Sequence, residues 1–420
     1  MTSRFRLPAD PEYTLRDSAR DSVVFAHRCL EPADEGRWRA ISSFVDPEAR
    51  IQEWHDFGTL EGPGWAANAM GGAYVLYEWG RFDRCHLLQH VALGLMDHVL
   101  EDGFLQPDGF IWPYRETTTE RRCLNFKHND DWFCPGATAR IALQMLWASD
   151  VLEKEPGRVE RLREAAARTA EWLLRHVQEV DGWYPRRCTI EGKAYPLSAE
   201  GGEDPISSDS ADGFHIIWLL TELTSRGLGD YRQVIRGKLE TVLQRGGIYG
   251  SVNHDTYDHD ENVAHAIAFR ALLRASRLLD DERLRAFAYE NALAGLERFQ
   301  MCEDRNGVAT QGLLYMEDSW DTAYLWENAE AALAYIEAFE DAGQEQYLEW
   351  AVTILRAIAR HHYGKLGFLT EGVDWNNHVG AQHHIGGAEY GAIRYTEPLL
   401  NNLHHVEAVM RCLRIRDSYD

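Results

Sequence analysis

Apolar and polar positions alternate in blocks along the whole chain, and the same order of blocks recurs. Each long apolar segment is followed by a turn that pairs Gly with an aromatic or aliphatic residue, then by a polar loop, then by another apolar segment. The turns are 108–112 (DGFIW), 181–184 (DGWY), 247–250 (GIYG), 306–308 (NGV) and 367–369 (GFL). This repetition predicts a fold built from similar helix-loop-helix units.

Six of the apolar segments have apolar residues on more than one helical face. Such segments predict helices that are buried on several sides. They start near Trp65, Asp131, Asp212, Glu261, Asp321 and Ala388.

The segments between them are amphipathic, with one apolar stripe and one charged face. This pattern predicts helices of an outer layer. They cover residues 15–29, 81–100, 157–180, 230–245, 281–299 and 344–362.

Six inner and six outer helices predict an all-α fold, an (α/α)6 barrel that forms a single domain over residues 1–420. A linear solenoid is the alternative, but its helices present one concave face and not an all-round apolar surface. In the barrel, the loops before the inner helices converge on one end. The one loop long enough to act as a lid covers residues 186–210.

The charge balance narrows the set of partners. The chain has 43 Lys and Arg against 67 Asp and Glu, a net charge of −24. An acidic surface of this kind repels nucleic acid and anionic membranes, so we expect neither as a partner. No apolar run is long enough to span a membrane, and Met1 to Tyr13 contains no apolar signal-peptide core. We therefore expect a cytoplasmic protein.

The cysteines do not indicate a metal or redox framework. There are seven, an odd number, and none forms a C-x-x-C pair. This argues against a disulfide scaffold or a structural zinc site and favours buried, reduced thiols. No metal site and no cofactor is expected, and the oligomeric state is not predicted.

Two polar loops before inner helices carry candidate chemistry. The loop after Trp112 contains Arg115, Lys127 and His128, and it ends at Asp131 and Trp132. Asp at this position also caps helix N-termini, which is the structural alternative. The loop 207–215 contains Asp212 at the equivalent position before an inner helix, and capping of that helix is again the structural alternative.

The densest polar stretch is 253–262, which contains His254, Tyr257, His259 and Glu261. So many titratable groups in ten residues favour shifted pKa values, which acid/base catalysis requires. A solvated acidic loop is the alternative. Later loops contain Asp318 with Trp320, Glu371 with Trp375, and the pair His383 and His384.

An acid beside a Trp therefore recurs at equivalent points of the repeat. Aromatic rings stack on the apolar faces of sugars, while carboxylates hold hydroxyls or transfer protons, so the pattern favours a carbohydrate cleft. Glycoside hydrolysis needs two carboxyl groups, one protonated and one ionised. The candidates for them are Asp131, Asp212, Glu261, Asp318 and Glu371. The candidates for binding an oligosaccharide or other glycoside are Trp65, Arg115, Lys127, His128, Trp132, His254, Tyr257, His259, Trp320, Trp375, His383 and His384.

Together, the six units, the Gly-aromatic turns and the acid-Trp loops resemble the six-hairpin glycosidase superfamily. The resemblance covers nearly the whole chain and identifies no single family. It implies an (α/α)6 barrel and a carbohydrate-active enzyme, and we interpret the chain as a glycoside hydrolase. Sugar epimerases and several polysaccharide lyases share this topology.

Three other functions stay open. The stretch 403–408 (LHHVEA) is similar to a His-x-His-x-x-Glu-Ala stretch of sugar 2-epimerases, with the two histidines adjacent here. An epimerase, isomerase or lyase would use His or Tyr, such as Tyr257 or Tyr395, to remove a proton. A second possibility is a non-catalytic sugar-binding toroid. The third is a terpene-cyclase-like enzyme, because 258–261 (DHDE) resembles the acidic motif of that class.

Overall fold

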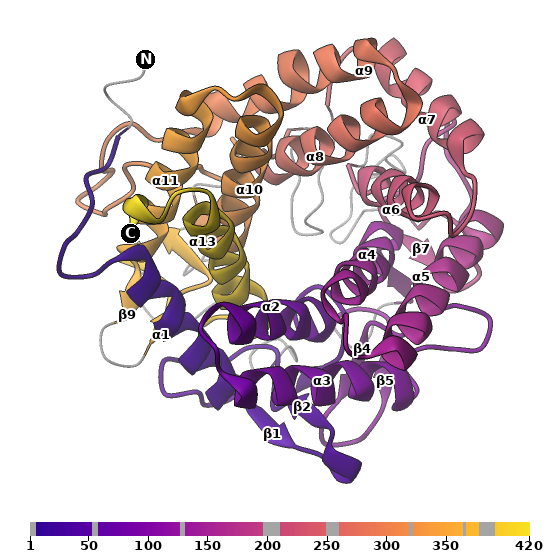
Figure 1. The fold of residues 1–420 in the computed structure, drawn as a ribbon, viewed down its shortest axis with the longest axis horizontal. Helices are drawn as coiled ribbons and strands as arrows, with labels where there is room; N and C mark the ends of the chain where they lie inside the picture. Colours follow the sequence, from indigo (N-terminus) through magenta and orange to yellow (C-terminus); the bar gives the residue numbers. More distant parts are fainter. Residues whose placement is uncertain are drawn as a thin grey trace.

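The computed structural model shows a ring of paired helices (Figure 1). The structure describes residues 6–52, 58–126, 131–195, 211–248, 260–318, 322–363, 367–377 and 391–420. Within these residues, no helix is long and apolar enough to cross a membrane. The all-α (α/α)6 barrel predicted by the sequence is confirmed.

Six helices form the inner ring. Each contacts the next in chain order, and the last contacts the first, so the ring is closed. The inner helices are α2 (Ala69–Phe82), α4 (Pro135–Val151), α6 (Gly213–Ser225), α8 (Asn262–Leu279), α10 (Leu325–Ala342) and α13 (Leu403–Ile415).

Outer helices pack against the inner ring, and α1 packs against both α13 and α11. The outer elements are α1 (Leu15–Arg28), α3 (His86–Glu101), α5 (Pro156–His176), α7 (Arg232–Arg245), α9 (Glu282–Phe287) and α11 (Glu345–Ala359). After α9 the chain continues as a π-helical turn, η3 (Ala288–Leu293), and a 3-10 turn, η4 (Leu296–Phe299).

The burial of individual helices explains the two layers. In α6 every residue from Gly213 to Leu220 is buried, because helices or loops cover it on all sides. In α7 only Ile235, Leu239 and Val242 are buried, a single stripe spaced by four and three residues. An all-round apolar segment is therefore placed inside the barrel and a one-stripe segment outside it.

Short antiparallel strands fill the loops. They pair as β1–β2, β3–β4–β5, β6–β7, β9–β10 and β8–β11–β12, with β11 in the middle of the last sheet. Their bounds are Leu30–Pro32 (β1), Trp38–Ala40 (β2), Leu60–Glu61 (β3), Tyr114–Glu116 (β4), Arg122–Cys123 (β5), Trp132–Phe133 (β6), Cys188–Thr189 (β7), Thr322–Tyr324 (β8), His362–Tyr363 (β9), Phe368–Leu369 (β10), Gly372–Asp374 (β11) and Gly391–Ala392 (β12).

Two of the predicted Gly turns are tight hairpins. Asp181 and Gly182 both have positive φ, and so do Asn306 and Gly307. Two consecutive residues with positive φ are typical of type I′ turns, for which Asp-Gly and Asn-Gly are the preferred pairs.

The last inner helix begins later than the sequence predicts. The prediction placed its start near Ala388, but the helical part begins with a π-helical turn at Pro398 and continues as α13 from Leu403. Before this turn, Gly391 and Ala392 form β12, which pairs with β11. The first part of the predicted helix therefore contains a short strand, and a short apolar run does not distinguish a strand from a helix.

Candidate active site at the barrel mouth

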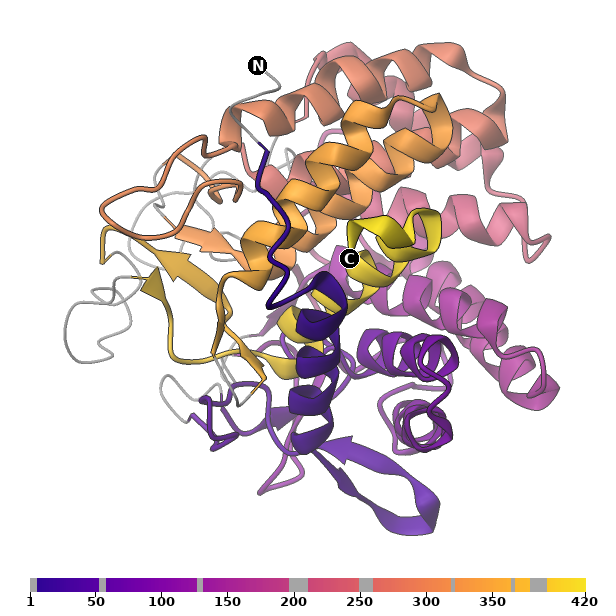
Figure 2. The ribbon, with the colours of Figure 1, turned by 60° about the vertical axis from the view of Figure 1, so that its left-hand side comes forward.

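Short strands lead directly into the inner helices at one end of the barrel. β6 is followed by α4, and β8 is followed by α10. Figure 2 shows β8 and its neighbouring strands on one side of the helices, together with the loops. We refer to this end as the barrel mouth.

A small cavity of about 30 Å³ lies where three of these loops meet. Its wall includes Trp65 from the loop before α2, Trp132 from β6, and Asp212, which immediately precedes α6. All three are residues that the sequence singled out. The fold therefore brings two predicted sugar-binding tryptophans and one predicted carboxylate to a common cavity.

Asp212 is almost completely buried, with 1% of its surface exposed. The first turn of α4 packs directly against it, because Gly136 has no side chain. A Cβ at position 136 would lie 2.6 Å from Cγ of Asp212. Burial raises the pKa of Asp212 to about 8, although Arg186 and Arg187 act in the opposite direction. At neutral pH this carboxyl therefore keeps its proton.

Arg186 connects Asp212 with a second buried carboxylate. It is attracted electrostatically to both Glu261 and Asp212, and its own pKa is lowered by burial and by the repulsion of Arg187. Glu261 has no exposed surface and immediately precedes α8. Two of the predicted catalytic carboxylates thus share one buried arginine.

Arginines also fix the two tryptophans of the cavity. The guanidinium of Arg187 lies 4.1 Å from the ring centre of Trp132. That of Arg140 lies 4.4 Å from the ring centre of Trp65. The edge of Trp326 meets Trp65 at a centroid distance of 4.6 Å. These contacts hold each ring in one orientation at the cavity wall.

His215 is a buried histidine between Trp65 and Asp212. Its Nδ1 lies 4.0 Å from Oδ1 of Asp212, and its ring centre lies 5.9 Å from that of Trp65. Neither ring nitrogen has a hydrogen-bond partner among the described residues. Burial lowers the pKa of His215 well below its usual value, and Arg140 adds to this. The imidazole is therefore neutral at neutral pH.

A buried ion cluster lies next to these residues on the inner helices. Arg140 donates to Glu330 at 2.7 Å, and Nε2 of His404 lies 3.1 Å from the same carboxylate oxygen. Arg270 binds the other oxygen of Glu330. Burial by itself would raise the pKa of Glu330, but Arg270, Arg140 and His404 hold it well below the usual range. This carboxylate stays ionised.

Three other predicted carboxylates lie in different surroundings. Asp131 is exposed. Asp318 is also exposed, and its Oδ2 accepts a hydrogen bond from Arg298 at 2.6 Å. Glu371 is partly buried and hydrogen-bonded to Tyr395, which raises the pKa of that phenol further than burial alone does.

The remaining described candidates are Arg115 and Trp375. Arg115 forms ion pairs with Glu61, Asp102 and Glu120, so its guanidinium is held by three carboxylates. Trp375 is buried, and Arg305 lies 5.3 Å from its ring centre. Eight candidates lie outside the described residues: Lys127, His128, His254, Tyr257, His259, Trp320, His383 and His384.

Arg140, Arg186, His215, Trp326 and Glu330 were not predicted as site residues. One of them had a recognisable signal in the sequence, because Arg140 is a charged residue within an apolar stretch of its inner segment. A charge in such a segment must find a buried partner. Within the part of the chain that the structure describes, no group of His, Cys, Asp or Glu is arranged to hold a metal ion.

No family model matches the chain, and no curated protein sequence is similar to it. Solved structures share its fold. A D-mannose isomerase matches with a TM-score of 0.64 and 12% identity, covering 96% of this chain and 97% of that one. A cellobiose 2-epimerase from Bacillus thermoamylovorans matches with a TM-score of 0.64 and 12% identity, covering 94% and 98%. An α-mannanase from Bacteroides thetaiotaomicron matches with a TM-score of 0.59 and 9% identity, covering 98% of both.

At these identities the likeness concerns the fold. The chain shares the (α/α)6-barrel fold of these carbohydrate-active enzymes, as the sequence predicted, and no single family is identified. The similar structures include an isomerase, an epimerase and a hydrolase. Because one fold supports all three reactions, the fold does not decide which reaction this chain catalyses.

Proposed function

We propose that this protein is a carbohydrate-active enzyme that hydrolyses a glycosidic bond of an oligosaccharide, with Asp212 as the general acid. One observation carries the proposal: Asp212 is a buried carboxyl in a tryptophan-lined cavity, and its pKa of about 8 keeps it protonated at neutral pH. A general acid of a glycosidase must carry a proton at the working pH to protonate the leaving oxygen.

Glu261 is the proposed second carboxylate. It precedes the next inner helix after Asp212, and it interacts electrostatically with Arg186. An ionised carboxylate either activates water or attacks the sugar carbon directly. Trp65 and Trp132 are the proposed contacts for the sugar ring.

The test is hydrolysis of a panel of oligosaccharides, followed by NMR of the products. We expect Asp212→Asn and Glu261→Gln each to lower kcat by at least about 100-fold, because each removes a group that transfers a proton or stabilises charge. Asp318→Asn is the matched control, since Asp318 forms an exposed ion pair with Arg298. Full activity of Asp212→Asn would contradict the proposal.

A sugar isomerase or epimerase is the second candidate, and His215 is the observation that favours it. A neutral imidazole without a described hydrogen-bond partner can remove a proton next to a carbonyl group. The protonated Asp212, 4.0 Å away, can supply a proton to the oxygen. In this case the product has the same mass as the substrate, and His215→Asn abolishes its formation.

A further inference from the structure

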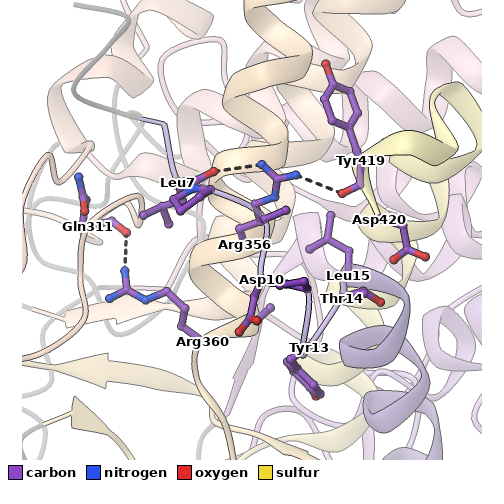
Figure 3. Close-up of a pocket in the computed structure, with 14 residues that line it drawn as sticks. Leu7, Asp10, Tyr13, Thr14, Leu15, Gln311, Arg356, Arg360, Tyr419 and Asp420 are labelled. Carbon is purple, nitrogen blue, oxygen red and sulfur yellow. Dashed lines mark hydrogen bonds between the residues drawn. The ribbon is translucent and has the colours of Figure 1, made fainter.

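A second and larger cavity lies on the outer side of the helical ring. Its volume is about 470 Å³, within the range of about 300 to 1,000 Å³ that is usual for small-molecule sites. It is enclosed by the segment before α1, by the outer helix α11, and by the C-terminal 3-10 turn η7 (Asp417–Tyr419) (Figure 3). Leu7, Leu15 and Ala359 give it apolar walls.

Arg356 of α11 lies in this cavity without an acidic partner. It donates to the main-chain oxygen of Leu7 at 3.0 Å and to that of Tyr419 at 3.3 Å. No carboxylate of the described residues lies within ion-pair distance of it. The side chain is about half buried, and burial lowers the pKa of Arg356. A guanidinium that is taken out of water without a counter-charge is unfavourable, and an anion would relieve this.

Arg360 lines the same cavity one helical turn further along α11. Residues four apart lie on the same face of a helix, so both side chains start from one wall of the cavity. Arg360 is held only weakly, because its contacts with the main-chain oxygen of Gln311 and with Asp304 are both 3.5 Å long. Figure 3 shows the guanidinium of Arg356 between Leu7 and Tyr419, and that of Arg360 turned toward Gln311.

Two acidic residues, Asp10 and Asp420, also line the cavity. Asp420 accepts hydrogen bonds from the main chain and the side chain of Arg16, at 2.8 and 2.9 Å. Asp10 accepts one from the main-chain N–H of Glu12 at 2.9 Å. Neither forms an ion pair with Arg356. Arg356 thus has no carboxylate of the cavity in ion-pair contact with it.

We propose that this cavity is a binding site for a small organic anion, whose phosphate or carboxylate group is held by Arg356 and Arg360. Arginine offers planar N–H groups that match both kinds of oxygen acid. The apolar walls at Leu7 and Leu15 contact the body of the ligand. This site is separate from the carbohydrate site proposed at the mouth and does not depend on it.

Isothermal titration calorimetry of the full chain tests the site with four probes: inorganic phosphate, glucose 6-phosphate, glucuronate and uncharged glucose. We expect one equivalent of glucose 6-phosphate or glucuronate to bind. Whichever of the two binds more tightly identifies the acid group. Arg356→Gln and Arg360→Gln should each weaken this binding about tenfold or more, because each removes charge-assisted hydrogen bonds. Arg232→Gln, an equal charge change at an exposed residue of α7, should leave it unchanged.

Two further variants keep the test decisive. Arg356 also holds the main chain of Leu7 and Tyr419, so Arg356→Gln could disturb folding, whereas Arg356→Lys keeps the charge and should retain part of the binding. Asp212→Asn, at the barrel mouth, should bind the anion like the wild type. The proposal is overturned if no anionic probe binds, or if binding is unaffected by both glutamine substitutions.

Discussion

The raised pKa of Asp212 suits the proposed acid catalysis but lowers the stability of the folded protein at higher pH. Its folded pKa of about 8 lies above the value of 3.8 for an exposed aspartate. Between these two values the folded state binds more protons than the unfolded state, so the free energy of unfolding falls as the pH rises. Retaining a buried carboxyl at such a position fits an active site, where stability is commonly sacrificed for activity.

We therefore predict that Asp212→Asn raises the free energy of unfolding at pH 8 by about 1 to 4 kcal/mol, because an amide needs no ionisation change on folding. Urea unfolding at pH 5 and pH 8 measures this, and the advantage of the variant should be smaller at pH 5. Asp318→Asn, at an exposed position, should change stability by less than about 0.5 kcal/mol. A variant that is less stable than wild type at pH 8 would show that Asp212 is ionised in the folded protein.

The same pKa sets the pH dependence of the proposed hydrolysis. If Asp212 is the general acid, kcat/KM should fall as the pH rises through about 8, because the carboxyl loses its proton. A pH–rate profile of the wild type tests this. A profile that is flat between pH 6 and pH 9 would exclude Asp212 as the acid.

At the scale of elements, histidines join the outer helix α1 to two neighbours, the inner helix α13 and the strand β9. His405 of α13 is hydrogen-bonded to Ser18 of α1 at 2.8 Å, and His362 lies 3.2 Å from the hydroxyl of Ser22. Burial lowers the pKa of His405 to about 3 and that of His362 well below its usual value. Both imidazoles are neutral in the folded protein.

This contact should be sensitive to acid. Because the folded pKa of His405 lies below the unfolded value of 6.5, stability is lost as the pH falls from about 6.5 toward 3. We predict that the free energy of unfolding changes less between pH 7 and pH 5 in His405→Gln than in the wild type. The difference between the two changes should be about 1 to 2 kcal/mol. The matched control is His90→Gln at an exposed position of α3, which should keep the wild-type slope.

Ion pairs join the inner helices α8 and α10. Arg270 donates to Glu337 at 2.9 Å and also binds Glu330, and its side chain is 2% exposed. We predict that Arg270→Met costs about 3 to 5 kcal/mol in urea unfolding, because it removes the buried positive charge that Glu330 and Glu337 share. Arg277→Gln on the same helix breaks an exposed pair with Asp341 and should cost less than about 1 kcal/mol. Equal costs would mean that the buried network adds nothing to stability.

At the scale of the whole molecule, the ring closes when α13 packs against α2, and α1 covers the junction by packing on α13. The first and last helices are thus neighbours, although they are separated by nearly the full length of the chain. We propose that the chain is one domain, and we predict a single unfolding transition in which the calorimetric and van't Hoff enthalpies agree. Two resolved transitions would contradict a single domain.

The amino-acid sequence alone determined the architecture. A segment that is apolar on all sides, such as Gly213 to Leu220, must be buried on all sides. A helix with a single apolar stripe, such as α7, can pack against the core on one side only. These local patterns were therefore sufficient to predict two rings of helices. The same patterns predicted that the loops before the inner helices carry the chemistry, and Trp65, Trp132 and Asp212 were named on that basis.

Only the tertiary structure decided which charged residues work together. Asp212 and Asp318 both stand in acidic loops near an inner helix, but one is buried beside Arg186 and the other forms an ion pair on the surface. Their pKa values and partners depend on distances across the barrel mouth, between residues far apart in the chain. A local pattern contains no such distances, because electrostatic interaction and desolvation are set by neighbours in space.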